Sequence, residues 1–319
     1  MTAPKVWVTG ASGFVGEALV LRLLLGRKFA PVAAVRGASR LLGLCPVARF
    51  EMGASSAGQL AGVQIVVHAA ARVHVMRETA DDALAEFRRV NVDGTLQLAR
   101  SAAEAGVKRF VFISSIKVNG ERTPVGRPFT AHDVPAPQDP YGISKHEAEQ
   151  ALRLLGIETG MEIVIIRPPL VYGPGVKANF LSLLKWLEKA LVLPLGAIRN
   201  QRSMVAIGNL VDFIEICLEH PAAAGQTFLV SDGDDLSTPR LMRRLASALG
   251  KKARLLPVPS KLLLICAAAA GKRAVAQRVC ESLQVDISKN REMLGWVPPI
   301  DVDTAMRRTA GHFLDTQKS

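Results

Sequence analysis

The sequence predicts an α/β fold: a doubly wound parallel Rossmann sheet with a smaller C-terminal lobe. Three observations lead to this prediction. In the first half of the chain, short apolar runs alternate with segments of helical period, as they do in βαβ units. A glycine-rich loop directly follows the first apolar run. After residue 168, proline and glycine interrupt the alternation and the pattern becomes irregular.

The individual elements follow from hydrophobic periodicity. Consecutive apolar residues predict buried strands, and apolar residues recurring every three or four positions predict helices. Strands are expected at 6–8, 32–35, 48–51, 65–67, 110–113 and 163–166. Helices are expected at 14–25, 83–105, 142–155, 178–189, 209–219, 239–249 and 303–314.

Composition limits the class of protein. The chain has 319 residues, of which 49% are hydrophobic, which is sufficient for a folded protein with two lobes. The longest uncharged apolar stretch, 262–270, is far shorter than the ~20 residues of a membrane span. We therefore expect no integral membrane segment and, without a signal-peptide core, a cytoplasmic location. Four scattered cysteines lack the spacing of a zinc site, and no metal is expected.

The chain is basic, with 40 Lys and Arg against 28 Asp and Glu and a net charge of +12. A nucleic-acid surface usually interleaves dense basic residues with aromatic ones, and no stretch here does so. A pocket for a polyanionic small molecule on a generally basic protein explains the charge better. No nucleic-acid partner is expected.

The loop at 10–16, Gly-Ala-Ser-Gly-Phe-Val-Gly, lies between the first strand and the first helix. Glycines there permit a tight turn and let a pyrophosphate approach the backbone N–H groups at a helix N-terminus. The alternative is that they only let the helix pack closely on the strand. The predicted cofactor contacts in this loop are Gly10, Ser12, Gly13, Phe14, Val15 and Gly16.

The second strand ends at Arg36, where NAD-binding folds usually place an Asp or Glu for the ribose 2′-hydroxyl. No acidic residue occurs between Glu17 and Glu51, and Arg40 follows four residues later. A cation there suits the 2′-phosphate of NADP, although the two arginines could also be ordinary surface residues. We expect NADP(H) to be preferred, with NAD(H) possible.

Tyr141 and Lys145 are spaced one helical turn apart, so both side chains can lie on one face. A neighbouring ammonium is expected to lower the pKa of the phenol from ~10 towards neutrality. Such a phenol can exchange a proton with a carbinol or ketone oxygen as hydride moves. Ser114 and Ser115 end the strand at 110–113, where a hydroxyl could hydrogen-bond the same oxygen.

Seven motifs spread over nearly the whole chain carry a family resemblance. They are TGASGFVG (9–16), HAAA (68–71), NVDGT (91–95), FISS (112–115), YGISK (141–145), RPPLVYGPG (167–175) and LGWVPP (294–299). Together they resemble the extended short-chain dehydrogenase/reductase family, whose members mostly act on nucleotide sugars. The resemblance implies a catalytic triad of Ser115, Tyr141 and Lys145. Ser115 is selected over Ser114 because Val118-Asn-Gly120 resembles the family's Val-Tyr-Gly.

The resemblance also implies ligand contacts. For the cofactor they are Ala69, Ala70, Ala71, Asn91 and Pro168, together with Tyr141 and Lys145. Asn179 and Arg202 match positions that hold the sugar-nucleotide diphosphate, and Arg278 lies within one residue of a second such arginine. Further candidate substrate contacts are Arg72, His74, Lys117 and Lys177, beside Ser115 and Tyr141. We accordingly divide the chain into an NADP(H)-binding Rossmann domain, 1–168, and a mainly substrate-binding lobe, 169–319, part of which returns to the Rossmann core.

Ile116 and Lys117 stand where the family's 4,6-dehydratases carry an Asp-Glu pair, which argues against dehydration. Because Arg36 favours NADPH, we expect a reductase of a nucleotide-linked 4-keto-6-deoxy sugar. Segments 71–76, 200–203 and 282–286 resemble the branch that converts UDP-4-keto-6-deoxy-N-acetylglucosamine to UDP-N-acetylquinovosamine for surface polysaccharide. The alternatives are a UDP-hexose or UDP-N-acetylhexosamine 4-epimerase with tightly bound NAD, and a non-catalytic NADP(H)-binding protein. By analogy with the family, a homodimer is expected.

Overall fold

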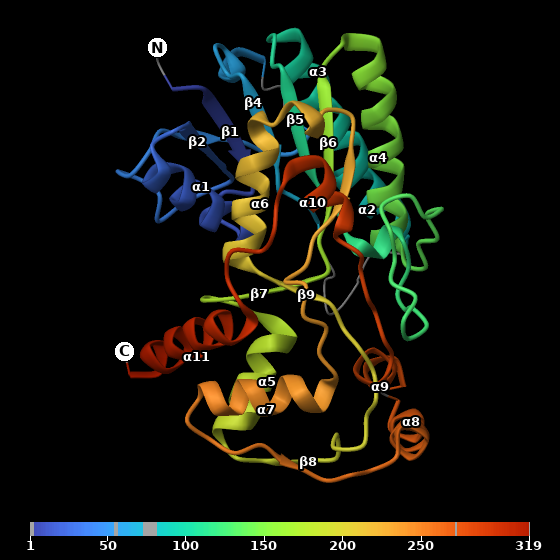
Figure 1. The fold of residues 1–319 in the computed structure, drawn as a ribbon. Helices are drawn as coiled ribbons and strands as arrows, with labels where there is room; N and C mark the ends of the chain where they lie inside the picture. Colours follow the sequence, from blue (N-terminus) through green and yellow to red (C-terminus); the bar gives the residue numbers. More distant parts are fainter. Residues whose placement is uncertain (1–2, 54–56, 73–81, 272, 319) are drawn as a thin grey trace.

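The computed structural model describes residues 3–53, 57–72, 82–271 and 273–318. Its centre is a seven-stranded parallel sheet with the order β10-β6-β5-β4-β1-β2-β3 (Figure 1). The strands are β1 (Lys5–Thr9), β2 (Ala30–Val35), β3 (Val47–Arg49), β4 (Ile65–His68), β5 (Arg109–Ile113), β6 (Glu162–Arg167) and β10 (Thr227–Leu229). The strand order reverses between β1 and β4, and the carboxyl ends of the strands at such a switch point bind ligands. The predicted doubly wound sheet is confirmed.

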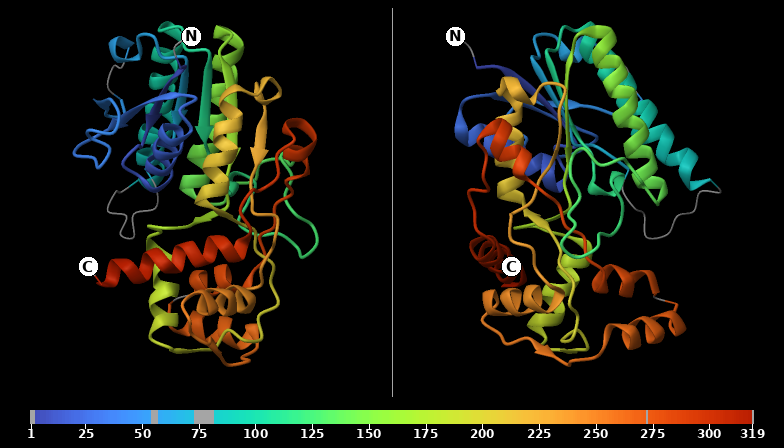
Figure 2. Two further views of the ribbon diagram at one scale, coloured as in Figure 1. Left: turned by 60° about the vertical axis from the view of Figure 1, so that its left-hand side comes forward. Right: turned by 45° about the vertical axis from the view of Figure 1, so that its right-hand side comes forward.

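Helices cover both faces of this sheet (Figures 1 and 2). One face carries α1 (Phe14–Gly26) and α6 (Ile207–Glu219), and the other carries α2 (Ala83–Arg88), α3 (Gly94–Glu104) and α4 (Pro140–Thr159). Successive residues of β1 alternate between the two layers: Val6 and Val8 join the core under α1 and α6, whereas Trp7 joins the opposite core. Both faces of the strand are therefore buried, which explains its continuous apolar sequence.

One predicted helix is interrupted. The sequence predicts a single helix over 83–105, but α2 and α3 are separated by a π-helical turn at Arg89–Asp93. Such turns are rare and are frequent at functional sites. Here the turn carries Asn91, whose buried side chain reaches the segment after β4. The other predicted elements are present within a few residues of their expected bounds.

The lower lobe in Figure 1 has a core of its own. It contains α5 (Ala178–Glu188), α7 (Thr238–Ala248), α11 (Val302–Lys318) and two small sheets, β7 (Leu170–Tyr172) with β9 (Met204–Ala206) and β8 (Val192–Leu193) with β11 (Arg254–Leu255). Two further helices, α8 (Ser260–Ala269) and α9 (Arg273–Cys280), pack on each other. By contrast, α6, β10 and α10 (Ser288–Leu294) lie with the large sheet although they follow β7 in the chain. Within the described ranges, no helix combines the length and hydropathy needed to cross a bilayer.

Candidate active site

The glycine loop is closed by backbone contacts that leave no room for side chains. Gly10 has φ +66°, and a Cβ on it would lie 2.8 Å from the backbone nitrogen of Ala70. A Cβ on Gly16 would lie only 2.3 Å from the carbonyl oxygen of Gly10. Helix α1 begins after Gly13 without a side-chain cap, so its first N–H groups are available to an anion. These features fit the pyrophosphate of a dinucleotide.

A buried histidine fixes the segment that faces this loop. His68 Nε2 lies 3.0 Å from Thr95 Oγ1, and His68 Nδ1 lies 2.7 Å from Thr9 Oγ1. Thr95 Oγ1 donates to the Asn91 carbonyl, so it accepts from Nε2–H, and the ring is the neutral Nε2–H tautomer. Thr9 Oγ1 in turn accepts from the backbone N–H of Ala70 at 3.2 Å. Burial lowers the pKa of His68 to about 3, which keeps it uncharged.

This network places Ala69 and Ala70, two of the predicted cofactor contacts, beside Gly10. The role of His68 was missed in the sequence, although the residue lies in the HAAA motif. The available signal was a histidine that ends an apolar strand, but its threonine partners are 59 and 27 residues away.

Asn91 connects the end of β4 to the start of α4. Its Oδ1 accepts from the Arg72 N–H at 2.8 Å, and its Nδ2 donates to the Arg72 carbonyl and to Ser144 Oγ, both at 3.1 Å. Ser144 Oγ donates to the Tyr141 carbonyl at 2.9 Å. Both amide hydrogens of Asn91 are therefore used inside the protein, which gives it a positioning role in the structure.

The two serines after β5 have different surroundings. Ser114 is buried and donates to Glu149 Oε1 at 2.5 Å, and the carboxylate of Glu149 pairs with the buried guanidinium of Arg167. Ser115 is half-buried, and its Oγ accepts from the Lys117 N–H at 3.2 Å. The hydroxyl hydrogen of Ser115 is thus free to be donated to a ligand, unlike that of Ser114. Pro168, another predicted contact, accepts from the N–H next to Ser115 at 3.0 Å.

Tyr141 and Lys145 lie on the first turns of α4, which Asp139 caps by accepting from the Gly142 N–H at 2.7 Å. Lys145 Nζ is buried, donates to the Ile113 carbonyl at 2.8 Å and lies 4.3 Å from the centre of the Phe112 ring. Burial lowers the pKa of Lys145 to about 7. Tyr141 is half-buried at the same strand edge.

The expected lowering of the Tyr141 pKa is wrong for this state of the protein. Burial of the phenol, and then the nearby Asp139 carboxylate, raise its pKa. The ammonium of Lys145 is directed to the backbone of β5. The phenol of Tyr141 is therefore neutral at neutral pH, whereas the amine of Lys145 is only partly protonated there.

Two predicted substrate contacts have partners around Tyr141. The ammonium of Lys117 forms an ion pair with Asp139. Arg72 Nη1 lies 3.4 Å from Glu86, and its guanidinium lies 5.8 Å from the centre of the Phe87 ring. The Phe87 ring packs edge-on to Tyr141 with centroids 6.1 Å apart. His74 lies outside the described residues.

Arg36 and Arg40 are exposed beyond the end of β2, the strand next to β1 and its glycine loop. Neither forms an ion pair with any described residue. Their guanidinium groups are therefore open to an anionic ligand at this edge.

In the lower lobe the structure brings two predicted arginines together. Arg202 Nη1 donates to the carbonyl oxygens of Arg278 and Glu281 at 2.8 and 3.1 Å. Burial, and to a lesser extent the charge of Arg278, lower the pKa of Arg202. Lys177 is exposed at the start of α5 and lines a cavity of about 210 Å³ with His312 of α11. The side chain of Asn179 lies outside the description.

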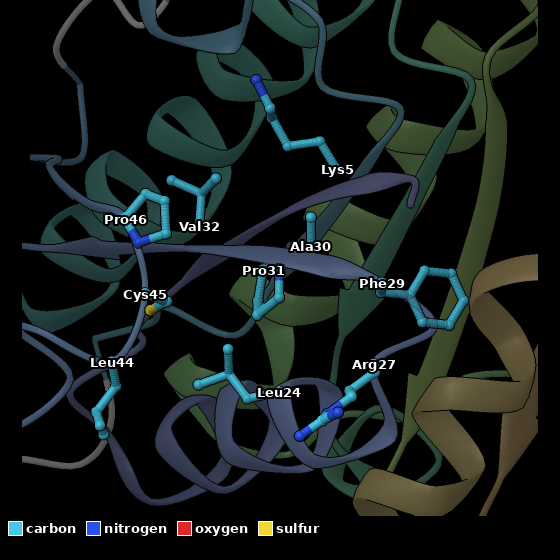
Figure 3. Close-up of a pocket in the computed structure, with 10 residues that line it drawn as sticks. All are labelled: Lys5, Leu24, Arg27, Phe29, Ala30, Pro31, Val32, Leu44, Cys45 and Pro46. Atoms are coloured by element: carbon cyan, nitrogen blue, oxygen red, sulfur yellow. The ribbon is translucent and has the colours of Figure 1, made fainter. Parts of the chain in front are cut away.

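A different cavity, of about 310 Å³, is shown in Figure 3. It is lined by Lys5, Phe29, Pro31 and Cys45, at the amino ends of β1 and β2. The catalytic candidates lie at the carboxyl ends, so this cavity is not part of the candidate active site.

Known proteins match this arrangement. The model of the NAD dependent epimerase/dehydratase family matches residues 6–231. A UDP-glucose 4-epimerase of Vibrio cholerae is 48% identical, covering 98% of this chain and 96% of its own. The solved UDP-glucuronic acid 4-epimerase from Bacillus cereus in complex with NAD has a TM-score of 0.79 at 19% identity, covering 98% of this chain and 99% of its own. The solved UDP-glucose 4-epimerase with UDP-glucose from Thermotoga maritima has a TM-score of 0.78 at 21% identity, covering 98% of this chain and 99% of its own.

The seven-stranded Rossmann sheet with its glycine loop is the fold of the dinucleotide-binding enzymes of the extended short-chain dehydrogenase/reductase type. The chain belongs to the NAD dependent epimerase/dehydratase family.

Proposed function

We propose that the protein is a 4-epimerase of a UDP-hexose or a UDP-N-acetylhexosamine that works with tightly bound NAD. The observation that carries the proposal is a single acid–base site, Tyr141 with Ser115, in a chain 48% identical to a UDP-glucose 4-epimerase over nearly its whole length. This replaces the 4-ketoreductase that the sequence favoured. The site also lacks the second acid of a dehydratase, because Ile116 is apolar and Lys117 is paired with Asp139.

Epimerisation at C4 requires a proton to leave the C4 oxygen and return to it while the configuration at C4 is inverted. When bound, NAD supplies the acceptor and donor of a hydride at C4. Tyr141 takes the proton from the C4 hydroxyl and later returns it to the same oxygen. Ser115 donates a hydrogen bond to that oxygen, and Lys145 holds the charge of the phenolate. Glu149, which is paired with Arg167, accepts the hydrogen bond of the Ser114 hydroxyl, so this hydroxyl is not available to the substrate.

We also propose that the lower lobe, within 169–319, holds the sugar nucleotide. The Arg202 side chain donates to the backbone carbonyl of Arg278, which brings the two residues together, and a guanidinium group forms strong hydrogen bonds with a diphosphate. Burial and the charge of Arg278 disfavour the charged form of Arg202, whereas the Glu281 carboxylate favours it, and a diphosphate bound beside the two arginines would favour it further.

A second candidate, the NADPH-dependent reduction of UDP-4-keto-6-deoxy-N-acetylglucosamine, is favoured by Arg36. This exposed cation follows β2 where an acidic residue would hold the 2′-hydroxyl of NAD, and no described residue neutralises it. A reductase consumes reduced cofactor at every turnover and has reason to use NADPH. The two candidates therefore differ in cofactor as well as in reaction.

The test compares both reactions on one preparation. Protein as purified is incubated with UDP-glucose or UDP-N-acetylglucosamine without added cofactor, and the 4-epimers are separated by chromatography. In parallel, NADPH oxidation is followed with UDP-4-keto-6-deoxy-N-acetylglucosamine. The proposal predicts epimers in the first assay. NADPH oxidation without epimers would establish the reductase instead.

We further propose that the enzyme is a homodimer paired through α3 and α4. Leu154 and Ile157, one turn apart on α4, are 61% and 82% exposed. Burying such an apolar pair against a second copy would stabilise the dimer.

A further inference from the structure

Helix α8 has an apolar face that nothing in the described chain covers. Leu262 and Ile265 are 50% and 67% exposed, and Cys266 on the same stripe is exposed too. The other stripe, which includes Leu263 and Leu264, is half-buried. Helices α8 and α9 pack on each other and project from the end of the lower lobe (Figures 1 and 2). The exposed stripe therefore lies on a projecting helical hairpin and is not covered by the described chain.

The surrounding chain is strongly and exclusively basic. Between Asp235 and Glu281 the sequence has no acidic residue and ten Lys and Arg. Lys261, on the same side of α8 as Ile265, is exposed. The other exposed cations that lead into the hairpin or lie on it are Lys251, Lys252, Arg254, Arg273 and Arg278. The apolar stripe is thus bordered by positive charge alone.

We propose that the α8–α9 hairpin is a docking surface for an anionic lipid bilayer. Apolar side chains beside a basic border are the features with which a surface helix binds a membrane interface. Each Lys or Arg held near an anionic leaflet adds to the attraction, roughly fivefold in binding constant. A second copy of the chain fits this surface poorly, because it would bring the exposed basic residues of one hairpin against those of the other.

The hairpin lies along such a surface and does not cross it. Helix α8 has 10 residues, which at ~1.5 Å per residue is about half the ~30 Å of the hydrocarbon core. Insertion is therefore limited to the exposed stripe, with the basic residues at the level of the headgroups. Binding is expected to be reversible and sensitive to salt.

The test is co-sedimentation of the full-length protein with vesicles of phosphatidylcholine alone or mixed with phosphatidylglycerol. The proposal predicts binding to the mixed vesicles that falls as salt is added and is at least roughly tenfold weaker to phosphatidylcholine. The paired change Leu262→Glu and Ile265→Glu, and separately Lys251→Glu with Lys252→Glu, should each weaken binding at least tenfold. None of these side chains is buried, so the thermal midpoint should stay the same.

Leu25→Glu is the matched control, because Leu25 is an exposed leucine on a helix of the large sheet, 83% exposed. It should leave vesicle binding unchanged. Equal binding to both kinds of vesicle, or equal losses in Leu25→Glu and in the α8 variant, would overturn the proposal. So would a smaller particle on gel filtration for the α8 variant with undiminished vesicle binding, since that outcome assigns the stripe to a second copy of the chain.

Discussion

Tyr141 and Lys145 lie one helical turn apart, yet the pKa of each is shifted mainly by burial and not by the other residue's charge. Burial raises the pKa of Tyr141, which keeps the phenol neutral, and lowers that of Lys145 to about 7, so the amine is only partly charged at neutral pH. The reactive phenolate–ammonium pair therefore depends on ligands that complete the site. The sequence spacing predicts the two residues and their common face, but the direction of these shifts follows from how deeply the turn is buried.

Replacing Tyr141 by Phe removes the proton-transferring group and keeps the ring that packs on Phe87. We expect kcat for epimerisation to fall ~10²–10⁴-fold, the usual contribution of a positioned acid or base. The retained NAD content of the purified variant should equal that of the wild type. A variant with nearly normal kcat would remove Tyr141 from the catalytic role.

His68 makes stability depend on pH. Its pKa is about 3 in the folded protein and ~6.5 when unfolded, so below pH 6.5 only the unfolded state takes up this proton. The free energy of unfolding should fall by about 2 kcal/mol between pH 6.5 and pH 5 from this group alone. Between pH 7 and pH 5, urea unfolding should show a loss of unfolding free energy that is about 2 kcal/mol smaller in His68→Gln than in the wild type.

The matched control is His132→Gln, because His132 is an exposed histidine. It should lose as much stability as the wild type between the two pH values. If His68→Gln and the wild type had the same pH dependence, His68 would not be the buried neutral group described here.

Among the elements, the start of α1 is the least tolerant of change. In Gly16→Ala the new Cβ would lie 2.3 Å from the Gly10 carbonyl, so the pyrophosphate loop must move. We expect the unfolding free energy to fall by about 1–3 kcal/mol and most of the bound NAD to be lost.

Gly311→Ala is the control, because Gly311 lies in α11 and an added Cβ would have no neighbouring atom within 4 Å. The Gly311→Ala variant should keep its NAD and be as stable as the wild type or slightly more stable. If Gly16→Ala also kept its NAD and its stability, the close packing of the glycine loop would not be required for NAD binding.

Elements with long periodic or continuous apolar patterns could be predicted, and α1, β5 and α4 are examples. The short strand β10 was missed because three residues, Thr227–Leu229, carry too little pattern, and its place depends on pairing with β6. The π-helical turn around Asn91 is also a tertiary effect, since it serves contacts with Arg72 and Ser144. Helix α8 was noticed only as an apolar stretch because residues 262–270 are apolar at every position and show no helical alternation with polar residues.

The same distinction applies to the site. The glycine loop and the Tyr141–Lys145 pair are local motifs, so their positions could be predicted from spacing alone. The His68 network and the Glu149–Arg167 ion pair join residues from different strands and helices. Their partners are fixed only when the sheet and α4 assemble, and no single segment of sequence reveals them.

In the whole molecule, Leu154 and Ile157 of α4 form an exposed apolar pair that could pack against a second copy of the chain. Light scattering coupled to gel filtration should give the mass of a dimer for the wild type. Ile157→Glu should shift it to a monomer, because a charge at 82% exposure is tolerated in the monomer and not in an apolar interface. A wild-type monomer, or a variant that stays dimeric, would contradict pairing through α4.

As a 4-epimerase, the protein would move a hydride from C4 and back to C4 of the same sugar within one site. UDP-glucose and UDP-N-acetylglucosamine carrying deuterium at C4 should be incubated with the protein as purified, in the presence of unlabelled NADH. We expect the corresponding 4-epimers with deuterium retained at C4. Absence of epimer, or epimer that has exchanged its deuterium for hydrogen from the added cofactor, would contradict it.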